Sequence, residues 1–256
     1  MDNLTIVKIG GNILNKDVDL DDFLEKFKRI KGKKILVHGG GRSANSLLTQ
    51  LGIAPKMHKG RRITDAETLR YVNMVYAGEI NKKVVGLLQA KNINALGLTG
   101  ADGNVILAKK RPVSDFDYGF AGDIVSVQKE QITSLIEAGF TPVFCSITHD
   151  GKGQLLNTNA DTIAATVAAN LAKNYAVSLR FCFELNGVLE DINQLDSVIS
   201  EISEMTFSRM QEEKTIADGM IPKLFNALNA KKAGAKEVII CSKENLLQIE
   251  TATKIV

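Results

Sequence analysis

The chain has 256 residues, 45% of them hydrophobic and 24% charged, and this balance predicts one soluble α/β domain with two lobes and a buried core. Its formal net charge of +3 comes from 32 basic and 29 acidic residues that are interspersed, and only 5% of residues are aromatic, so nucleic-acid binding is not indicated. The three cysteines lie far apart in apolar runs, and no apolar run approaches the roughly 18 residues of a membrane span. We therefore expect a cytoplasmic protein without a membrane segment, a disulfide framework or a cysteine metal site.

Two strands near the start of the chain each run into glycines. The strand Leu4–Ile9 carries Lys8 and ends in Gly10-Gly11, and the strand Lys34–His38 leads into Gly39-Gly40-Gly41 and a helix. Because three successive residues lack side chains, their backbone N–H groups can close on an anion at a helix N-terminus. The same glycines match a dinucleotide fingerprint, but no acidic residue follows at the expected spacing. A tight turn alone explains one glycine better than three, so an anion cradle is favoured, with both glycine turns in one shared site.

Hydrophobic spacing predicts a long helix from Leu69 to Leu87, and Thr64 and Glu67 match a capping box that starts this helix beside Arg61-Arg62. The segments 105–108 and 124–127 predict an antiparallel hairpin or small sheet over the site, and 142–147 predicts one continuous buried strand. The other predicted elements are helices at 23–30, 44–51, 132–136, 161–171 and 205–213 and from residue 218, and strands at 93–99, 176–183, 238–241 and 254–256.

Three charged residues are candidates for phosphate chemistry, although each has a simpler interpretation. Lys8 can be an edge-strand charge and Lys223 a solvated helix residue. Asp161 opens an Ala-rich helix, where N-terminal capping is the simpler role for an isolated acid. An acid between two lysines can, however, hold both on one phosphate, and this possibility favours a phosphate-binding role for the three residues together.

Arg62 and two asparagines are candidate substrate ligands. Arg62 follows Gly60 and precedes a capped helix, where a guanidinium can hold a carboxylate bidentately, although one arginine of the Arg61-Arg62 pair is expected to be a surface charge. Asn157 and Asn159 alternate along an extended segment, so we expect both on the same side of the chain. The motifs of P-loop proteins, protein kinases, zinc proteases and α/β-hydrolases are absent from the sequence, which disfavours those classes.

Taken together, these motifs resemble the amino acid kinase family, and within it the branch that phosphorylates N-acylated glutamate. The segments GRRIT, GLTGADG and LLNTNAD separate this branch from the aspartate, carbamate and uridylate kinases. The matching segments run in family order over almost the whole chain: VKIGG (7–11), VHGGG (37–41), GRRIT (60–64), MVYAGEINK (74–82), GLTGADG (97–103), YGFAGDI (118–124), LLNTNAD (155–161) and DGMIPK (218–223).

The resemblance implies a three-layer αβα sandwich with a mainly parallel open sheet, the carbamate kinase-like fold, over residues 1–256. It implies an N-terminal lobe, about 1–173, for acyl-glutamate binding and dimerisation, and a C-terminal lobe, about 174–256, for ATP. The implied reaction uses ATP and Mg²⁺ to phosphorylate the γ-carboxylate of N-acetyl-L-glutamate, giving N-acetyl-L-glutamyl 5-phosphate and ADP for arginine synthesis.

The resemblance also implies roles for individual residues. Lys8 and Lys223 stabilise the transferring phosphoryl group, and Asp161 orients them. Gly40 and Gly41 hold the amino-acid substrate, while Arg62 and Asn157 engage its α-carboxylate and its γ-carboxylate attacks. Asn159 is assigned to the same substrate, phosphate or ATP binding is assigned to Gly10, Gly11, Glu184, Asn186, Gly187, Leu189, Thr215, Ile216 and Ala217, and no residue is assigned to a metal.

Two features depart from the family pattern or qualify it. Phe183-Glu184 stand where relatives usually have Ser/Thr-Asp, so we expect altered nucleotide contacts there. The first strand follows the start of the sequence almost directly, as in arginine-insensitive homodimers, whereas arginine-inhibited hexamers carry an extra N-terminal helix. Three alternatives stay open: N-succinyl-L-glutamate as the substrate, a nucleoside monophosphate kinase activity, and a non-catalytic amino-acid sensor, against which the intact Lys8, Asp161 and Lys223 argue.

Overall fold

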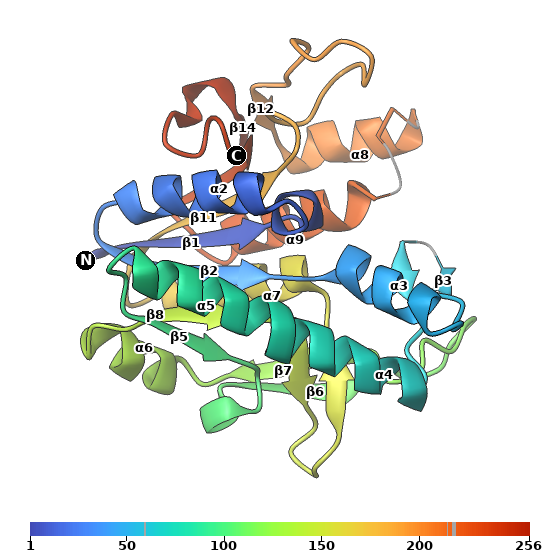
Figure 1. Ribbon diagram of the computed structural model, residues 1–256. Coiled ribbons are helices and arrows are strands. Elements are labelled where there is room, and N and C mark those ends of the chain that lie inside the picture. Colours follow the sequence, from blue (N-terminus) through green and yellow to red (C-terminus); the bar gives the residue numbers. More distant parts are fainter. Residues whose placement is uncertain (59, 214, 217–218) are drawn as a thin grey trace. The chain divides into compact units, whose positions relative to one another are not determined.

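The computed structural model describes residues 1–58, 60–213, 215–216 and 219–256, which form two compact units (Figure 1). The first unit combines Met1–Lys34 with Ala164–Val256, and the second contains Ile35–Ile163. The start of the chain groups with its C-terminal part because β1 (Asn3–Ile9) pairs in parallel along its whole length with β11 (Ala176–Phe183). The lobe boundary near residue 173 follows the order of the sequence and stays a prediction.

The first unit contains a mainly parallel run of strands in the order β12-β14-β13-β11-β1. Among these neighbours only β13 and β14 pair in antiparallel fashion. The amphipathic helix α2 buries Leu20, Phe23, Leu24 and Phe27, and it lies on one side of β1 and β11 with α9 on the other (Figure 1). Besides β1 and β11, the elements of this unit are α1 (Gly11–Leu14), α2 (Asp17–Arg29), β12 (Glu201–Ile202), α8 (Glu204–Glu212), α9 (Ile221–Lys232), β13 (Glu237–Ser242), a 3₁₀ turn (Ile249–Thr251) and β14 (Thr253–Ile255).

The second unit contains a parallel sheet with strand order β2-β8-β5 and a small sheet with strand order β10-β9-β6-β7. Helix α5 packs on β5 and β8, and α6 packs on β8. Strand β2 begins in the first unit, and α7 begins in the second unit and continues into the first. The elements are β2 (Lys33–His38), α3 (Gly41–Gln50), β3 (Met57–His58), β4 (Arg61–Arg62), α4 (Ala66–Asn73), a π-helix (Met74–Ile80), α5 (Asn81–Ala90), β5 (Ala95–Leu98), a 3₁₀ turn (Asp102–Asn104), β6 (Ile106–Lys110), β7 (Gly122–Val127), α6 (Lys129–Glu137), β8 (Thr141–Phe144), β9 (Ile147–His149), β10 (Leu155–Asn157) and α7 (Ala160–Leu171).

The small sheet confirms one prediction and corrects another. The hairpin of β6 and β7 is antiparallel, as predicted for 105–108 and 124–127. The single strand predicted over 142–147 is wrong, because β8 ends at Phe144 and the chain re-enters strand structure at Ile147 in the other sheet. Both strands are buried, so the apolar run continues across the break and periodicity gives no sign of it.

The long helix predicted from 69 to 87 is also divided, because a seven-residue π-helical segment, Met74–Ile80, separates α4 from α5. The predicted capping box is wrong: Asp65, not Thr64, caps α4, and its carboxylate accepts a 2.8 Å hydrogen bond from the Thr68 amide. Within the described parts of the chain, none of the helices is long and apolar enough to cross a membrane.

His38, the last residue of β2, is fully buried. The Asn81 amide nitrogen donates to its Nε2 at 3.0 Å and also to the Val143 carbonyl at 2.9 Å. Nδ1 therefore carries the proton and donates to the Gly39 carbonyl at 2.8 Å. Burial lowers the pKa of His38 from 6.5 to about 4, so the imidazole is neutral in the folded protein at neutral pH.

This burial predicts a pH dependence of stability. Between pH 6.5 and about 4 the unfolded chain protonates His38 and the folded protein does not, so the free energy of unfolding falls as the pH is lowered through this window. The loss from this group is roughly 1.4 kcal/mol per pH unit, or about 3 kcal/mol in all. Urea denaturation at several pH values should show a flatter profile for His38→Gln than for the wild type. Parallel profiles would contradict the burial of a neutral imidazole, since the carboxylates are common to both proteins.

Candidate active site

The glycine turn after β2 is packed tightly against the π-helical segment. A Cβ on Gly40 would lie 2.5 Å from Ile80 Cδ1 and 2.6 Å from Tyr76 Cδ1, so only glycine fits there. Gly41 begins α3, and a Cβ at this position would lie 3.9 Å from both the Arg62 Nη2 and the Tyr76 hydroxyl. The glycine turn that the sequence predicts to cradle an anion lies at a helix N-terminus and is bordered by a guanidinium and a phenol.

Arg62 is buried, with 8% of its surface exposed, and only one part of its guanidinium is occupied. Nη2 donates to the Gly41 carbonyl at 2.9 Å and to Asn45 Oδ1 at 2.6 Å. The Nε and Nη1 groups are buried and have no hydrogen-bond partner among the residues that the structure describes. Buried donors are almost always paired, so this edge of the guanidinium is prepared for a ligand with two acceptor oxygens, such as a carboxylate.

Asn157, at the end of β10, is joined to Arg62 through Thr64. Its side-chain amide donates to Thr64 Oγ1 at 3.0 Å, and the Thr64 hydroxyl reaches the Arg62 carbonyl at 3.4 Å. The Asn157 backbone amide donates to the Phe120 carbonyl at 2.9 Å, which fixes the strand at this point. The second unit therefore brings together Gly40, Gly41, Arg62 and Asn157 as one polar site.

Asn159 has a different environment from Asn157. The strand ends at Asn157, and the Asn159 side-chain oxygen accepts hydrogen bonds from the amide and hydroxyl of Thr162, at 3.0 and 3.4 Å. Asn159 therefore caps α7, the role that the sequence made the simpler one for Asp161. Asp161 lies in the first turn of that helix, where a carboxylate is favoured by the helix dipole.

Lys8 and Lys223 both lie near the carboxyl end of β11 in the first unit. Lys8 is opposite Phe181 in the parallel register of β1 and β11. Lys223, 8% exposed on α9, places its ammonium 5.7 Å from the ring centre of Phe181 and 5.5 Å from that of Phe183. Burial raises the pKa of the Cys182 thiol, and the positive charges of both lysines partly oppose that rise, so both act at this one position.

Two glycines and Phe183 complete this end of the first unit. The Gly10 amide donates to the Cys182 carbonyl at 2.8 Å, and a Cβ on Gly10 would meet that oxygen and the Phe183 Cβ at 3.3 Å. Gly11 begins α1, and a Cβ there would meet nothing within 4 Å. The unusual Phe183 thus has a role that the sequence did not suggest, because its ring supports the Lys223 ammonium.

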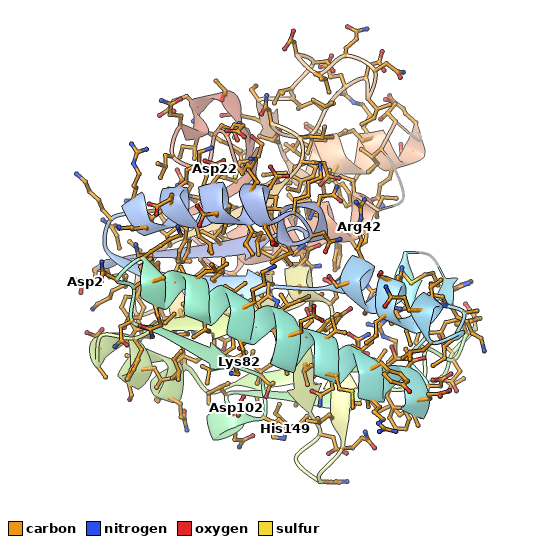
Figure 2. All side chains as sticks on the ribbon, in the orientation of Figure 1. Asp2, Asp22, Arg42, Lys82, Asp102 and His149 are labelled. Carbon is orange, nitrogen blue, oxygen red and sulfur yellow. The ribbon has the colours of Figure 1, made fainter. Side chains whose placement is uncertain are left out.

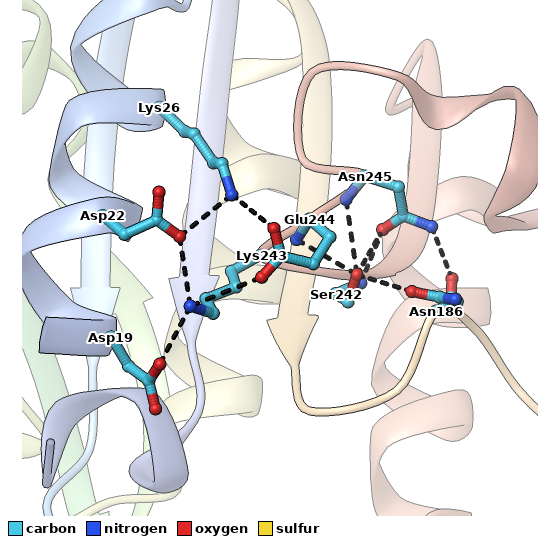
Figure 3. A network of polar contacts seen from close by, with 8 residues as sticks. All are labelled: Asp19, Asp22, Lys26, Asn186, Ser242, Lys243, Glu244 and Asn245. Atoms are coloured by element: carbon cyan, nitrogen blue, oxygen red, sulfur yellow. Dashed lines mark hydrogen bonds and ion pairs between the residues drawn. The ribbon is translucent and has the colours of Figure 1, made fainter. Parts of the chain in front are cut away.

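The segment after β11 is held by a polar network in which Ser242 and Asn245 are buried and Asn186 is exposed (Figure 3). Asn245 donates to the Asn186 carbonyl at 2.9 Å, and its Oδ1 accepts from the Ser242 amide at 2.7 Å. The Ser242 hydroxyl reaches Asn186 Oδ1 at 2.8 Å. The neighbouring Gly187 is closely packed, because a Cβ at this position would lie 2.5 Å from Thr253 Oγ1.

The same turn is also tied to α2. Lys243 contacts Asp19 at 2.9 Å and Asp22 at 3.1 Å, and Lys26 contacts Glu244 at 2.6 Å and Asp22 at 2.9 Å (Figure 3). Hydrogen bonds that Lys243 donates to Asp19 and Asp22 are the main reason that its pKa is raised. The ion pairs and the amide network therefore fix the segment that carries Asn186 relative to α2.

The other residues predicted to bind ATP lie around this segment. Glu184 is exposed and Leu189 is buried, bridged to Val198. Thr215 follows α8, and its amide donates to the Met210 carbonyl at 3.1 Å. Ile216 is half-buried, and Ala217, like Asp218 of the DGMIPK segment, lies outside the described residues.

One matching segment of the sequence has a structural explanation. Asp102, labelled in Figure 2, folds back on its own turn and accepts hydrogen bonds from the Thr99 amide at 2.6 Å and the Thr99 hydroxyl at 2.8 Å.

The sequence analysis missed Asn45 and Tyr76, which lie beside Arg62. Tyr76 lies in the matching segment MVYAGEINK, but a helical pattern does not report which residues face the glycine turn, so neither residue was given a role.

The family model described as the amino acid kinase family matches residues 3–242. An acetylglutamate kinase from Parabacteroides distasonis is 52% identical over 97% of this chain and 97% of its own length, and one from Cytophaga hutchinsonii is 49% identical over 100% and 97%.

Solved structures agree at the level of the fold. A Streptococcus mutans protein superposes with a TM-score of 0.84 at 26% identity, covering 99% of this chain and 98% of its own. Giardia carbamate kinase, at 16% identity, superposes with a TM-score of 0.68 over 100% of this chain and 98% of its own, which confirms the carbamate kinase-like fold. With the family model matched from residue 3 to residue 242 and relatives about half identical over nearly the full length, the chain belongs to the amino acid kinase family.

Proposed function

We propose that this chain transfers the γ-phosphoryl group of ATP to the γ-carboxylate of N-acetyl-L-glutamate, the second step of arginine biosynthesis. The products are N-acetyl-L-glutamyl 5-phosphate and ADP. The observation that carries the proposal is the buried Arg62, whose Nε and Nη1 are without partners among the described residues, beside the glycine turn. The relatives that share about half of this sequence are named for this activity.

The acceptor needs little activation. A carboxylate is ionised at neutral pH and is already a nucleophile, so no general base is required. The task of the second unit is to hold the substrate in place: Arg62 binds the α-carboxylate bidentately, Asn157 supports it, and Gly40 and Gly41 allow close approach of the backbone. Holding the α-carboxylate fixes the direction of the γ-carboxylate, and such positioning is a large part of catalysis in phosphoryl transfer.

The donor side is assigned to the residues at the end of β11. Lys8, Lys223 and the Gly10 and Gly11 amides neutralise charge on the transferring phosphoryl group, and Asp161 orients the lysines. ATP is assigned to Glu184, Asn186, Gly187, Leu189, Thr215, Ile216 and Ala217.

Mg²⁺, when bound, shields the phosphate charges. The described residues contain no group of three or more acidic, histidine or cysteine side chains that could hold a metal. We also propose that residues 1–173 serve the acceptor and homodimerisation and that residues 174–256 serve ATP.

The proposed function is tested with purified protein, MgATP and separate acceptors. N-acetylglutamate, N-succinylglutamate, aspartate, carbamate and UMP are compared, with hydroxylamine added to trap acyl phosphates. We expect hydroxamate with N-acetylglutamate and ADP release in equal amount. Hydroxamate from N-succinylglutamate alone would show that the substrate carries a succinyl and not an acetyl group. ADP release with UMP alone would show that the acceptor is a nucleoside monophosphate and not an acylated amino acid.

Arg62 should control acceptor affinity. Arg62→Lys keeps the charge and removes the flat two-donor edge, so the KM for N-acetylglutamate should rise by roughly 10²-fold, with little change in the KM for ATP. Arg70→Ala is the control, because Arg70 is exposed on α4 with its guanidinium 5.9 Å from the centre of the Tyr71 ring. An unchanged acceptor KM in folded Arg62→Lys removes this residue from the substrate site.

Lys8 and Lys223 should control turnover. Replacing either with Ala should lower kcat by roughly 10²- to 10³-fold, the scale found when one preorganised electrostatic donor is removed. The double variant should cost less than the sum of the single losses in free energy, because both act on one group. Lys232→Ala, an exposed lysine on the same helix, is the control. Near-normal kcat in either folded single variant would refute the charge-neutralising role.

A further inference from the structure

Tyr76 belongs to the matching segment MVYAGEINK, but neither the sequence analysis nor the proposed mechanism gives it a role. It lies on the π-helical segment Met74–Ile80, and only 5% of its surface is exposed. The edge of its ring lies against Gly40, and its hydroxyl lies beside Gly41, as the distances from the two glycines show. A Cβ on Gly41 would lie 3.9 Å from the Tyr76 hydroxyl and 3.9 Å from the Arg62 Nη2, so the hydroxyl and the guanidinium border the same turn.

The ring and the hydroxyl of Tyr76 serve different purposes. The ring shares with Ile80 the task of filling the space over Gly40, and a phenylalanine would fill it equally well. The hydroxyl adds a polar atom at a buried place next to a cation, which a packing role does not require. Burial raises the pKa of Tyr76, and the positive charge of Arg62 and a hydrogen bond from its side chain only partly oppose this, so the phenol keeps its proton at neutral pH. The hydroxyl oxygen accepts from Arg62, and its O–H is left to donate to a ligand.

A neutral phenol beside an arginine provides a second kind of hydrogen-bond donor. The open edge of Arg62 offers Nε and Nη1, and the Tyr76 hydroxyl comes from a different element. An α-carboxylate bound at this edge has further lone pairs after accepting two bonds from the guanidinium. A π-helical turn is uncommon and is often found at functional sites, and here it carries the residue that faces the glycine turn.

We infer that Tyr76 is a specificity-determining substrate residue, whose hydroxyl donates a hydrogen bond to the α-carboxylate that Arg62 binds. This inference rests on the proposed function, because it assumes that the acceptor carries a carboxylate at this place. Arg62 supplies the positive charge, and Tyr76 adds a directional hydrogen bond that is weaker when the group at the α position is neutral.

The test is a cycle of one substitution and one ligand change. Wild type and Tyr76→Phe are each assayed with N-acetylglutamate and with its α-carboxamide, which keeps the γ-carboxylate as the phosphoryl acceptor. With N-acetylglutamate, Tyr76→Phe should raise the acceptor KM by about tenfold, the scale of a hydrogen bond to a charged group. With the α-carboxamide the same substitution should change the KM by less than about threefold. The kcat and the KM for ATP should be unchanged in both cases.

Tyr71→Phe is the matched control, because the Arg70 guanidinium lies 5.9 Å from the Tyr71 ring, but Tyr71 is on α4 and is not among the nearest neighbours of Gly40 and Gly41. This control should leave both acceptor KM values unaltered. Equal effects of Tyr76→Phe on both ligands, or no effect on either, would overturn the inference even if the enzyme is active. Wild-type protein that forms no hydroxamate would instead overturn the proposed function, so the two failures are distinguishable.

Discussion

A buried, half-occupied guanidinium is the constraint on which the second unit depends. Taking an arginine out of water is costly unless hydrogen bonds and opposite charge compensate it. In this protein Gly41 and Asn45 satisfy Nη2, while Nε and Nη1 stay without partners among the described residues. The free protein therefore keeps part of the desolvation cost unbalanced, and we propose that binding of a carboxylate removes it. Pre-organised donors of this kind give both affinity and direction to the substrate.

The surroundings of Arg62 explain several local features at once. Gly40 is a glycine because Tyr76 and Ile80 occupy the space of a side chain. Tyr76 reaches this place from a π-helical turn that interrupts an otherwise regular helix. Thr64 is buried between Arg62 and Asn157 and connects two segments that are far apart in the sequence. The polar residues of the site are thus held by the backbone and by one another before any ligand is bound.

In the first unit, the two cations Lys8 and Lys223 lie near the carboxyl end of β11. Side chains alternate along a strand, so Phe181 and Phe183 lie on the same face of β11, and the Lys223 ammonium lies over both rings. Cys182 points to the other face, where it pairs in register with Cys241 of β13. Aromatic faces attract a nearby cation, so the two rings help to hold the Lys223 ammonium in place.

The sequence predicted those parts of the fold that depend on periodicity and on chemistry local to one segment. The strand 176–183 and the Ala-rich helix ending at 171 were placed to the residue, because long apolar patterns with clear ends are informative. The division of 142–147 into two strands was not predictable, since both halves are buried and only pairing partners differ. Asp65 replaced Thr64 as the cap because Thr64 is held by Asn157, a contact formed only in the folded chain.

The candidate site divides in the same way. Arg62, the glycine turns and the two lysines carry sequence signals of their own, whereas Tyr76, Asn45 and the ring of Phe183 gain their roles from tertiary neighbours. The most direct test of the central claim, that the open edge of Arg62 receives the α-carboxylate, is thermal unfolding with ligands in the absence of ATP. N-acetylglutamate should raise the Tm, by an amount equivalent to about 2.7 kcal/mol at a concentration of about 100 Kd. At the same concentration, 4-acetamidobutyrate, which lacks only the α-carboxylate, should leave the Tm nearly unchanged, and an equal rise with both ligands would contradict the claim.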